Sequence, residues 1–314
     1  MLMCKTHPKT QLTPWGRRAT PRPMQDLQKT SVITVSYHTG HVLYDMLASV
    51  LAQDGLAELI VVDNGNSLNT VEKLEAMAVQ NPKFKLITGH GNVGFAKGNN
   101  LGAKAATGDY LFLLNPDSVL EVGDIQKLMV QSEKLPRPHL IGPRILDANG
   151  KEQSGSRRGA LTPWNALVEV FFLYKIFPKL ERWKWHEAPL PADITEVPAI
   201  SGAAMFLPRD DFFLVGGLDE GYFLHVEDVD FCFSLRKAGA KIYFMPQLSV
   251  KHIGATSDVP KPVVERHKTI SLSRYFHKNF KDTTPLPFLW VLDIAIWARF
   301  YLYLLRSKLA AKKN

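Results

Sequence analysis

Three groups of polar residues follow short apolar runs of the sequence. Asp63-Asn64-Gly65 comes after ELIVV, Asn115-Pro116-Asp117 comes after YLFLL, and His252 comes after LSVK. Loops that follow parallel strands lie at the carboxyl edge of the sheet, where ligands bind in open α/β folds. The first two groups are also good turn formers. The prediction of a site therefore depends on all three groups meeting at one place.

A second cluster consists of carboxylates. The segment HVEDVDF brings Glu227, Asp228 and Asp230 within four positions, directly after the turn GGLDEGYF. Acidic residues at the start of a helix are favourable there for electrostatic reasons alone. They can also supply a general base, and the neighbouring aromatic residues predict that this base stands at the rim of an apolar cleft.

Glycines recur between the two strand-end groups. GNVGFAKGNNLGAKAATGD has glycines at 91, 94, 98, 102 and 108. Their spacing places several on one helical face, which is typical of close packing of a helix on a sheet. The start of the segment could also offer backbone N–H groups to a phosphate. It matches neither GxGxxG nor GxxxxGK[ST], so a Rossmann dinucleotide site and a P-loop both fit poorly.

The residues around these groups have the pattern of an α/β fold. SVITVSY, ELIVVD, FKLIT and DYLFLLN are short runs rich in β-branched and apolar residues, and residues 41–53, 68–80 and 93–106 have helical spacing. Continuous apolar runs are typical of parallel strands buried on both faces. We therefore predict a mostly parallel, doubly wound sheet, whose carboxyl edge is the usual place for ligands.

Later elements continue the fold less regularly. We predict a helix over 122–134, a strand at HLIGPRIL, and an irregular insert over 147–195. A strand at VPAISGAAMFLP, a helix over 227–239, a strand at KIYFMP and a helix over 263–280 follow. No linker divides residues 30–259, so we expect a single domain there. Residues 1–29 are expected to be a disordered basic arm, and 260–314 to be C-terminal helices.

Composition excludes several classes of protein. The chain has 314 residues, 46% of them hydrophobic, which is enough for a sizeable core and excludes a disordered or fibrous protein. Its two cysteines, Cys4 and Cys232, cannot build a disulfide framework or a four-cysteine zinc site. A cytoplasmic protein is therefore expected.

Positive charge is confined to the two ends. Residues 1–30 carry six Lys and Arg against Asp26, residues 260–314 carry eleven against three acidic residues, and those between carry 21 basic and 26 acidic residues. Such ends suggest attachment to an anionic surface, or they are simply solvated tails. The nearly apolar, aromatic run at 286–305 favours membrane lipid over nucleic acid.

That run has about the length of a bilayer span. Asp293 and Arg299 lie within it, and each would cost roughly 2.5 to 3.5 kcal/mol at the bilayer centre. We therefore expect a helix lying on the inner face of the plasma membrane, held by its aromatic and basic residues. The alternative is a terminal helix that packs on its own domain or on a second subunit.

Taken together, these segments resemble a known family. VSYHTG, VVDNG, the glycine-rich segment with LFLLNPD, SGAAMFLPRDDFFLVGGLDEGYFLHVEDVDFCFSLRKAG and VKHIGATS occur in an order similar to that of the inverting GT-A glycosyltransferases of family 2. The bacterial rhamnosyltransferase-like branch is the most similar. The resemblance runs from about Ser31 to Ser257, and it implies a GT-A fold that binds a nucleotide sugar.

The resemblance also implies roles for individual residues. The nucleotide sugar would be contacted by Val35, Ser36, Tyr37, Asp63, Asn92, Gly94, Asn99, Asn115 and Asp117. Asn115-Pro116-Asp117 occupies the place of the DxD motif, with Asn115 in place of its first Asp. Asp117 and His252 would therefore hold Mg²⁺ or Mn²⁺. Asp228 would be the catalytic base, and Glu227 and Asp230 would orient it or the acceptor.

The implied reaction moves a sugar, L-rhamnose by resemblance, from a dTDP- or UDP-sugar to a hydroxyl of a glycan or polyprenyl-linked glycan during cell-surface polysaccharide synthesis. A sugar-nucleotide pyrophosphorylase is an alternative, but no Gly-rich loop with a basic residue follows the first strand. An inactive nucleotide-binding scaffold at the membrane is another. The presence of Asp63, Asp117, Asp228 and His252 together argues against it. Among other residues, Arg157 and Arg158 are expected to be a solvated pair, with contact to a phosphate of the acceptor as the alternative.

Overall fold

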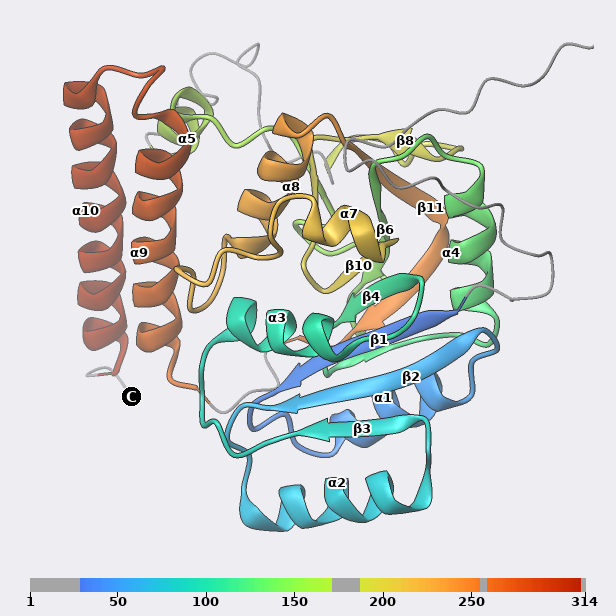
Figure 1. Cartoon of the computed structure of the whole chain (residues 1–314). Helices are drawn as coiled ribbons and strands as arrows, with labels where there is room; N and C mark the ends of the chain where they lie inside the picture. Colours follow the sequence, from blue (N-terminus) through green and yellow to red (C-terminus); the bar gives the residue numbers. More distant parts are fainter. Residues whose placement is uncertain (1–28, 171–186, 255–258, 312–314) are drawn as a thin grey trace, which may run out of the picture.

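The computed structural model describes residues 29–170, 187–254 and 259–311 (Figure 1). The predicted basic arm, except for Lys29, lies outside the described residues, as do part of the 147–195 insert and the basic pair Lys312 and Lys313.

A nine-stranded sheet forms the centre of the described structure. Its order is β3-β2-β1-β4-β10-β6-β11-β5, with β8 paired to β11. The strands are β1 (Thr30–Ser36), β2 (Leu56–Asp63), β3 (Phe84–Ile87), β4 (Tyr110–Leu114), β5 (Ser118–Val119), β6 (His139–Leu146), β8 (Thr195–Glu196), β10 (Ala204–Pro208) and β11 (Lys241–His252). β1 pairs in parallel with both β2 and β4, while β10 runs antiparallel between β4 and β6. The mostly parallel α/β sheet is therefore confirmed.

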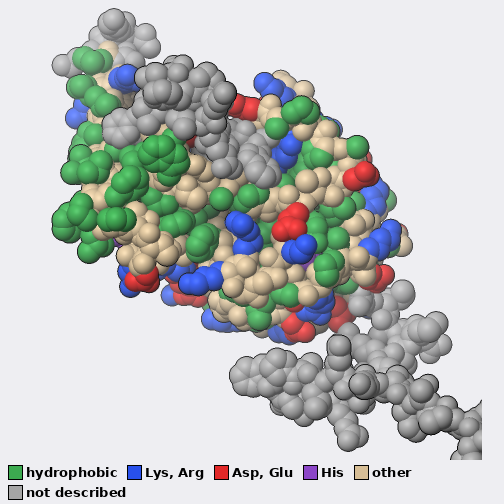
Figure 2. All heavy atoms as spheres, turned by 90° about the horizontal axis from the view of Figure 1, so that it is seen from above, with side chains coloured by type: hydrophobic (Ala, Val, Ile, Leu, Met, Phe, Trp, Pro, Cys, Tyr) green, Lys and Arg blue, Asp and Glu red, His purple; other side chains and the backbone are tan. Residues whose placement is uncertain are grey.

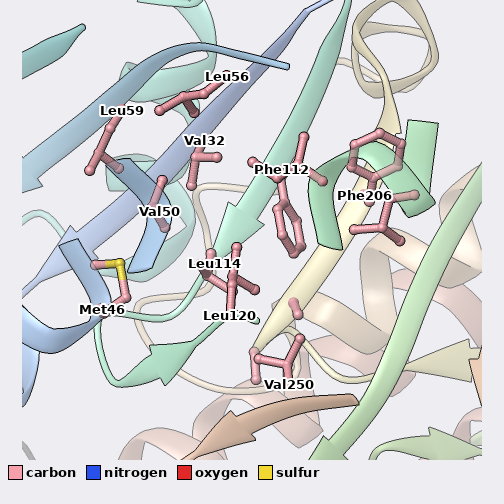
Figure 3. Packing of buried hydrophobic residues seen from close by; sticks show 14 of the residues in the cluster. Val32, Met46, Val50, Leu56, Leu59, Phe112, Leu114, Leu120, Phe206 and Val250 are labelled. Atoms are coloured by element: carbon pink, nitrogen blue, oxygen red, sulfur yellow. The ribbon is translucent and has the colours of Figure 1, made fainter. Parts of the chain in front are cut away.

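Helices cover both faces of this sheet. α1 (Val42–Leu51), α2 (Leu68–Gln80) and α4 (Asp124–Glu133) pack on one face. α3 (Phe95–Ala105), α7 (Arg209–Phe213) and α8 (Glu227–Lys237) pack on the other. Figure 3 shows the first of these cores, where Met46 and Val50 of α1 meet Val32 of β1 and Leu59 of β2. Burial of these apolar faces fixes the strands and hence the loops at their ends.

A third apolar cluster holds the C-terminal helices to the body. α9 (Lys261–Phe280) and α10 (Leu286–Ala311) lie side by side, and α5 (Pro163–Val170) contacts α10 (Figure 1). Leu289, Leu292 and Ile296 of α10 are buried against Tyr275 and Phe276 of α9. One face of α10 therefore packs on its own chain, as the alternative prediction for this segment had it.

Two predicted strands differ from the structure. LSVK is not separate from KIYFMP, because both belong to β11, whose pairing with β6 is interrupted between Met245 and Ser249. Pro246 falls in this interruption, where its missing N–H does no harm to the ladder. VPAISGAAMFLP is divided into β9 (Ala199–Ile200), which pairs with β7 (Arg157–Arg158), and β10.

The glycines of α3 pack as their helical spacing predicts. A Cβ atom added at Gly98 would lie 2.8 Å from Val35 Cγ1, and one at Gly102 would overlap Ile33. Side chains at these positions would push α3 away from β1. The two glycines therefore set the closeness of the helix to the sheet and, with it, the position of the loop that precedes the helix.

Candidate active site

The candidate residues gather at the carboxyl edge of the sheet. Asp63 ends β2 and His252 ends β11, while Asn115 and Asp117 follow β4. β10 runs the opposite way, so Gly202 and Ala203 before it reach the same edge, where the Asn115 N–H donates to Ala203 O at 2.9 Å. The predicted strand-end residues are thus brought to one edge.

Asp63 organises the turn on one side of this edge. Its Oδ1 accepts hydrogen bonds from the backbone N–H groups of Gly65 and Asn66, and its Oδ2 accepts one from Thr88 Oγ1 at 2.7 Å. Burial alone would raise the pKa of Asp63, but these hydrogen bonds outweigh it and lower the pKa below its usual value. Asp63 is therefore a charged, fixed group.

Residues of β1 and the glycine-rich segment border this turn. The Asn66 side chain donates to Ser36 O at 3.1 Å, and Val35 is buried beside Gly98. A Cβ atom on Gly65 would lie 3.8 Å from Asn92 N and 3.9 Å from Tyr37 Cε2, so these three residues are neighbours. Asn99 instead donates to Phe95 O within its own helix.

Several contacts join α3 to the turn that leads into the carboxylate cluster. Gly94 has a positive φ of 85°, and a Cβ there would lie 2.7 Å from Phe223 O. Asn100, which the sequence analysis did not select, bonds to both the N–H and the carbonyl of Leu218. These contacts hold the turn before α8 against α3. The two consecutive Asn residues of the GNN sequence were the feature from which the role of Asn100 could have been predicted.

Asp117 and His252 meet directly. Asp117 Oδ1 lies 3.1 Å from His252 Nε2, and both residues are largely buried. The backbone N–H of Gly254 donates to Asp117 Oδ2 at 3.1 Å. Asn115 Nδ2 lies 3.2 Å from the same histidine nitrogen. The two predicted metal ligands, Asp117 and His252, and the predicted nucleotide-sugar contact Asn115 are therefore in contact, although 137 positions separate Asn115 from His252.

Gln153 determines which nitrogen of His252 carries the proton. Gln153 Nε2 donates to His252 O at 2.6 Å, which leaves Gln153 Oε1 to accept from His252 Nδ1 at 2.8 Å. In the neutral imidazole the proton is then on Nδ1, and the lone pair of Nε2 faces the Asp117 carboxylate. No sequence motif marked Gln153, which lies in the irregular insert.

This arrangement fits a divalent cation. Two electron-pair donors, Asp117 Oδ1 and His252 Nε2, face each other, and Asn115 Oδ1 is buried with no hydrogen-bond partner among the described residues. A cation satisfies such a donor set. No group of three His, Cys, Asp or Glu residues suited to a metal occurs in the described part of the chain. Phosphate or water oxygens would have to complete the coordination.

Asp228 lies at the start of α8, next to the beginning of β10. Its Oδ2 accepts hydrogen bonds from Gly202 N at 2.9 Å and from Arg158 Nη1 at 3.0 Å, and its Oδ1 accepts one from Val229 N. The expectation that Arg157 and Arg158 are a solvated pair is wrong. Arg157 is buried against Glu152 and two carbonyls, and Arg158 forms the ion pair with Asp228.

The two neighbouring carboxylates have different surroundings. Glu227 is buried, its Oε2 has no hydrogen-bond partner among the described residues, and burial together with the charge of Asp228 raises its pKa well above the usual range. Asp230 accepts from Tyr222, Lys278 and Asn279, which ties α8 to α9. The structure thus places Asp230 in a helix contact, with no described bond to Asp228.

A separate hollow lies at the opposite edge of the sheet. It has a volume of about 570 Å³ and is lined by Thr107, Asp109, Arg137 and Arg209, among others. Arg137 there is paired with Asp211 at 2.6 Å. None of the predicted site residues lines this hollow, and the amino ends of the parallel strands are not where ligands bind in open α/β sheets. We therefore assign the site to the carboxyl edge.

Two rhamnosyltransferases are similar in sequence to this chain. N-acetylglucosaminyl-diphospho-decaprenol L-rhamnosyltransferase of Mycobacterium tuberculosis is 28% identical over 257 residues, which are 76% of this chain and 81% of the relative. Rhamnosyltransferase WbbL of Escherichia coli is 25% identical over 230 residues, 70% of this chain and 82% of that protein.

Solved structures share the fold. GalNAc-T7, solved with UDP, GalNAc and Mn²⁺, superposes with a TM-score of 0.58 at 19% identity over 82% of this chain. The match spans about half of that protein, 52% of its length. The mannosyltransferase PcManGT of Pyrobaculum calidifontis, solved with GDP-Man and Mn²⁺, gives a TM-score of 0.54 at 17% identity over 89% of this chain and 71% of that one. The GT-A fold is confirmed.

The sequence model described as Glycosyl transferase family 2 matches residues 31–191, about half of the chain, which include β1 to β6 and the Asn115-Pro116-Asp117 turn. Together with the strand-edge geometry and the rhamnosyltransferase relatives, this match answers the question left open between a transferase and a pyrophosphorylase. The chain belongs to glycosyltransferase family 2 and has the GT-A fold.

Proposed function

We propose that the protein transfers L-rhamnose from a dTDP- or UDP-activated donor to a hydroxyl of a lipid-linked glycan, with inversion, during cell-surface polysaccharide synthesis. The two rhamnosyltransferase relatives support the sugar, and the name of one of them, which contains N-acetylglucosaminyl-diphospho-decaprenol, supports the acceptor class. The observation that carries the proposal is the contact chain from Asp117 and His252 through Asn115 and Ala203 to Gly202 and Asp228.

On this proposal, the two ends of the contact chain have opposite tasks. Asp117 and His252 would hold Mg²⁺ or Mn²⁺, which when bound neutralises charge on the leaving diphosphate. Asp228 would accept the proton of the attacking hydroxyl at a carboxylate oxygen. Because the base and the leaving group stand at different ends of the chain of contacts, the hydroxyl would attack from the face opposite the diphosphate, which inverts the configuration.

The remaining strand-end residues would receive the nucleotide. Asp63 is charged and fixed, so one of its oxygens suits a ribose hydroxyl or a base N–H. Ser36, Tyr37 and Val35 would border the base, and Asn92 and Gly94 would border the diphosphate-sugar, since Asn92 adjoins Gly65. Asn99 would act indirectly, through the start of α3. Glu227 and Asp230 would position α8 and therefore Asp228.

The outer face of α10 would bind the inner surface of the plasma membrane. Residues 286–309 form a helix that is long and apolar enough, by length and composition, to cross a bilayer, and most of it is not buried in the protein. Asp293 and Arg299 both pair with α9, through His277 and Glu265. The opposite face exposes large apolar side chains, gathered on one side of the molecule in Figure 2: Leu286, Trp290, Val291, Ile294, Tyr301, Leu302, Leu305 and Leu309. Interfacial binding fits this division better than a span.

We predict that Asp228→Asn removes transfer and spares donor binding. Asn keeps the size of the side chain but is no longer a base, so turnover should fall by about 10²- to 10⁴-fold. The measurement is sugar transfer from dTDP-rhamnose or UDP-sugars to extracted lipid-linked acceptor, with nucleotide affinity determined in parallel. Asp45→Asn, on the exposed side of α1, is the control. An Asp228→Asn enzyme with near-normal turnover would remove Asp228 from the role of base.

We also predict that Gln153 sets metal affinity. Gln153→Leu removes the acceptor for the Nδ1 proton of His252, so Mn²⁺ binding in the presence of UDP should weaken by about 10- to 100-fold. Gln153→Glu keeps an acceptor there and should bind Mn²⁺ nearly as well as the natural protein. Electron paramagnetic resonance of free Mn²⁺ measures both. Equal Mn²⁺ affinity in the Leu and Glu variants would contradict the role of Gln153.

The membrane contact predicts co-sedimentation with vesicles that contain anionic phospholipid. Changing Trp290 and Ile294 to Gln, both exposed on α10, should weaken the binding by about tenfold or more, because each removes apolar surface from the contact. Leu68→Gln, which alters a residue 82% exposed on α2, should leave the binding unchanged. An equal loss of vesicle binding in the Trp290 and Ile294 variant and in the Leu68 variant would contradict the role of this surface. Absence of vesicle binding by the natural protein would also contradict it.

A further inference from the structure

The proposed base is held by an arginine in this structure. Arg158 Nη1 lies 3.0 Å from Asp228 Oδ2, and the two side chains are only 16% and 11% exposed. The same oxygen accepts from Gly202 N, and the other oxygen accepts from Val229 N. A carboxylate oxygen that already accepts two hydrogen bonds has little room for a proton from a sugar hydroxyl. Loosening of the ion pair would therefore open Oδ2 to that proton, whereas Oδ1, with its one bond from Val229 N, keeps a lone pair.

A second cation, Lys268, lies on α9 next to His267, whose ring stacks on Phe223 of the turn before α8. Lys268 of α9 is partly buried, and in the described part of the chain it has neither a hydrogen-bond nor an ion-pair partner. Burial lowers its pKa, Glu265 acts against this, and the positive charges of Arg299 and Arg158 lower it further. Because Glu265 is already paired with Arg299 at 3.2 Å, Lys268 lacks an anion of its own.

Contacts of residues close to Lys268 hold this part of α9 against the turn before Asp228. Ser271 Oγ, one helical turn away on α9, donates to Leu224 O at 3.0 Å, and the His267 ring stacks on Phe223 with centroids 4.7 Å apart. This turn continues into His225 and Val226, both with positive φ of 66° and 71°. Such strained backbone persists only where the surroundings hold it, and it is common at ligand sites.

A hollow lined mostly by apolar residues, together with Thr162 and Arg236, lies beside neighbours of Arg158 and Asp228, although neither of the two lines it. It has a volume of about 200 Å³, and its lining includes Leu161, Ala199, Val229, Tyr275 and Phe280. Ala199 is the strand partner of Arg158, and Val229 follows Asp228 in α8. A lipid diphosphate complements these features of the protein. Its anionic diphosphate suits the two cations, and the apolar chain joined to it suits the hollow.

We propose that Arg158 and Lys268 form a binding subsite for the diphosphate of a sugar-diphospho-lipid acceptor. When the acceptor binds, Arg158 exchanges the Asp228 carboxylate for the acceptor diphosphate, and Asp228 becomes free to take the proton of the attacking hydroxyl. The apolar hollow receives the first part of the lipid chain. The inference deepens the proposed function and rests on it.

The chemistry of inversion assigns the subsite to the acceptor rather than to the donor. The base acts on the face of the sugar opposite the leaving diphosphate. A cation that is bonded to the base therefore stands on the acceptor's side. The donor diphosphate has its own ligands at the other end of the contact chain, where Asp117 and His252 meet.

Binding of farnesyl diphosphate tests the subsite without any need for transfer. The natural protein should bind it, as measured by isothermal titration calorimetry, in the presence of saturating UDP and Mn²⁺. Arg158→Gln and Lys268→Gln should each weaken binding by about tenfold or more, since each removes a charge-assisted hydrogen bond. Asp228→Asn should instead strengthen it, because the neutral side chain no longer competes with the diphosphate for the charge of Arg158. Farnesol should bind much more weakly to all of these proteins.

Arg137→Gln is the matched control. It breaks another arginine–aspartate pair, with Asp211, at the opposite edge of the sheet, and should leave farnesyl diphosphate binding unchanged. If Arg158→Gln fails to fold, Lys268→Gln and Asp228→Asn still decide. Displacement of farnesyl diphosphate by UDP, or equal affinity in Asp228→Asn and the natural protein, would overturn the subsite. UDP binding in the variants shows separately whether the donor site of the proposed function is intact.

Discussion

Parallel pairing of β1, β2 and β4 is the constraint on which the site depends. It sends the ends of these strands to one edge of the sheet, and the antiparallel β10 brings its first residues to the same place. Asp63, Asn115 and Gly202 reach that edge because of strand direction, and the packing of apolar faces on both sides of the sheet keeps them there. The polar groups of the site would not remain together without this rigid support.

Close packing then places the second half of the site. Gly98 and Gly102 bring α3 onto β1, and Gly94 and Asn100 attach the 217–226 turn to α3. This turn leads into α8 and Asp228, and α9 fixes it from the other side through Ser271. The base is therefore positioned by contacts with α3 and α9 as well as by the N–H of Gly202, just before β10.

The sequence was sufficient for the elements whose pattern is local. The helix at 68–80 and the strand at 139–146 have the predicted bounds, because their periodicity and flanking residues are complete within the segment. Asp117 and His252 were also predicted as partners, and they are in contact. Gln153 was not predicted for the site, and for Arg158 a contact with an acceptor phosphate was only the alternative to a solvated pair. They lie in an insert without periodicity, and their partners are 70 and 99 positions away, so that only the folded chain reveals what they contact.

The central claim is that one edge of the sheet holds both the leaving diphosphate and the base. A crystal structure of the protein with Mn²⁺ and a non-hydrolysable nucleoside diphosphate sugar measures this directly. The account predicts Mn²⁺ bound to Asp117 Oδ1 and His252 Nε2, with the anomeric carbon between the diphosphate and Asp228. A nucleotide bound at the opposite edge, beside Arg137, or a metal ion remote from Asp117, would contradict it.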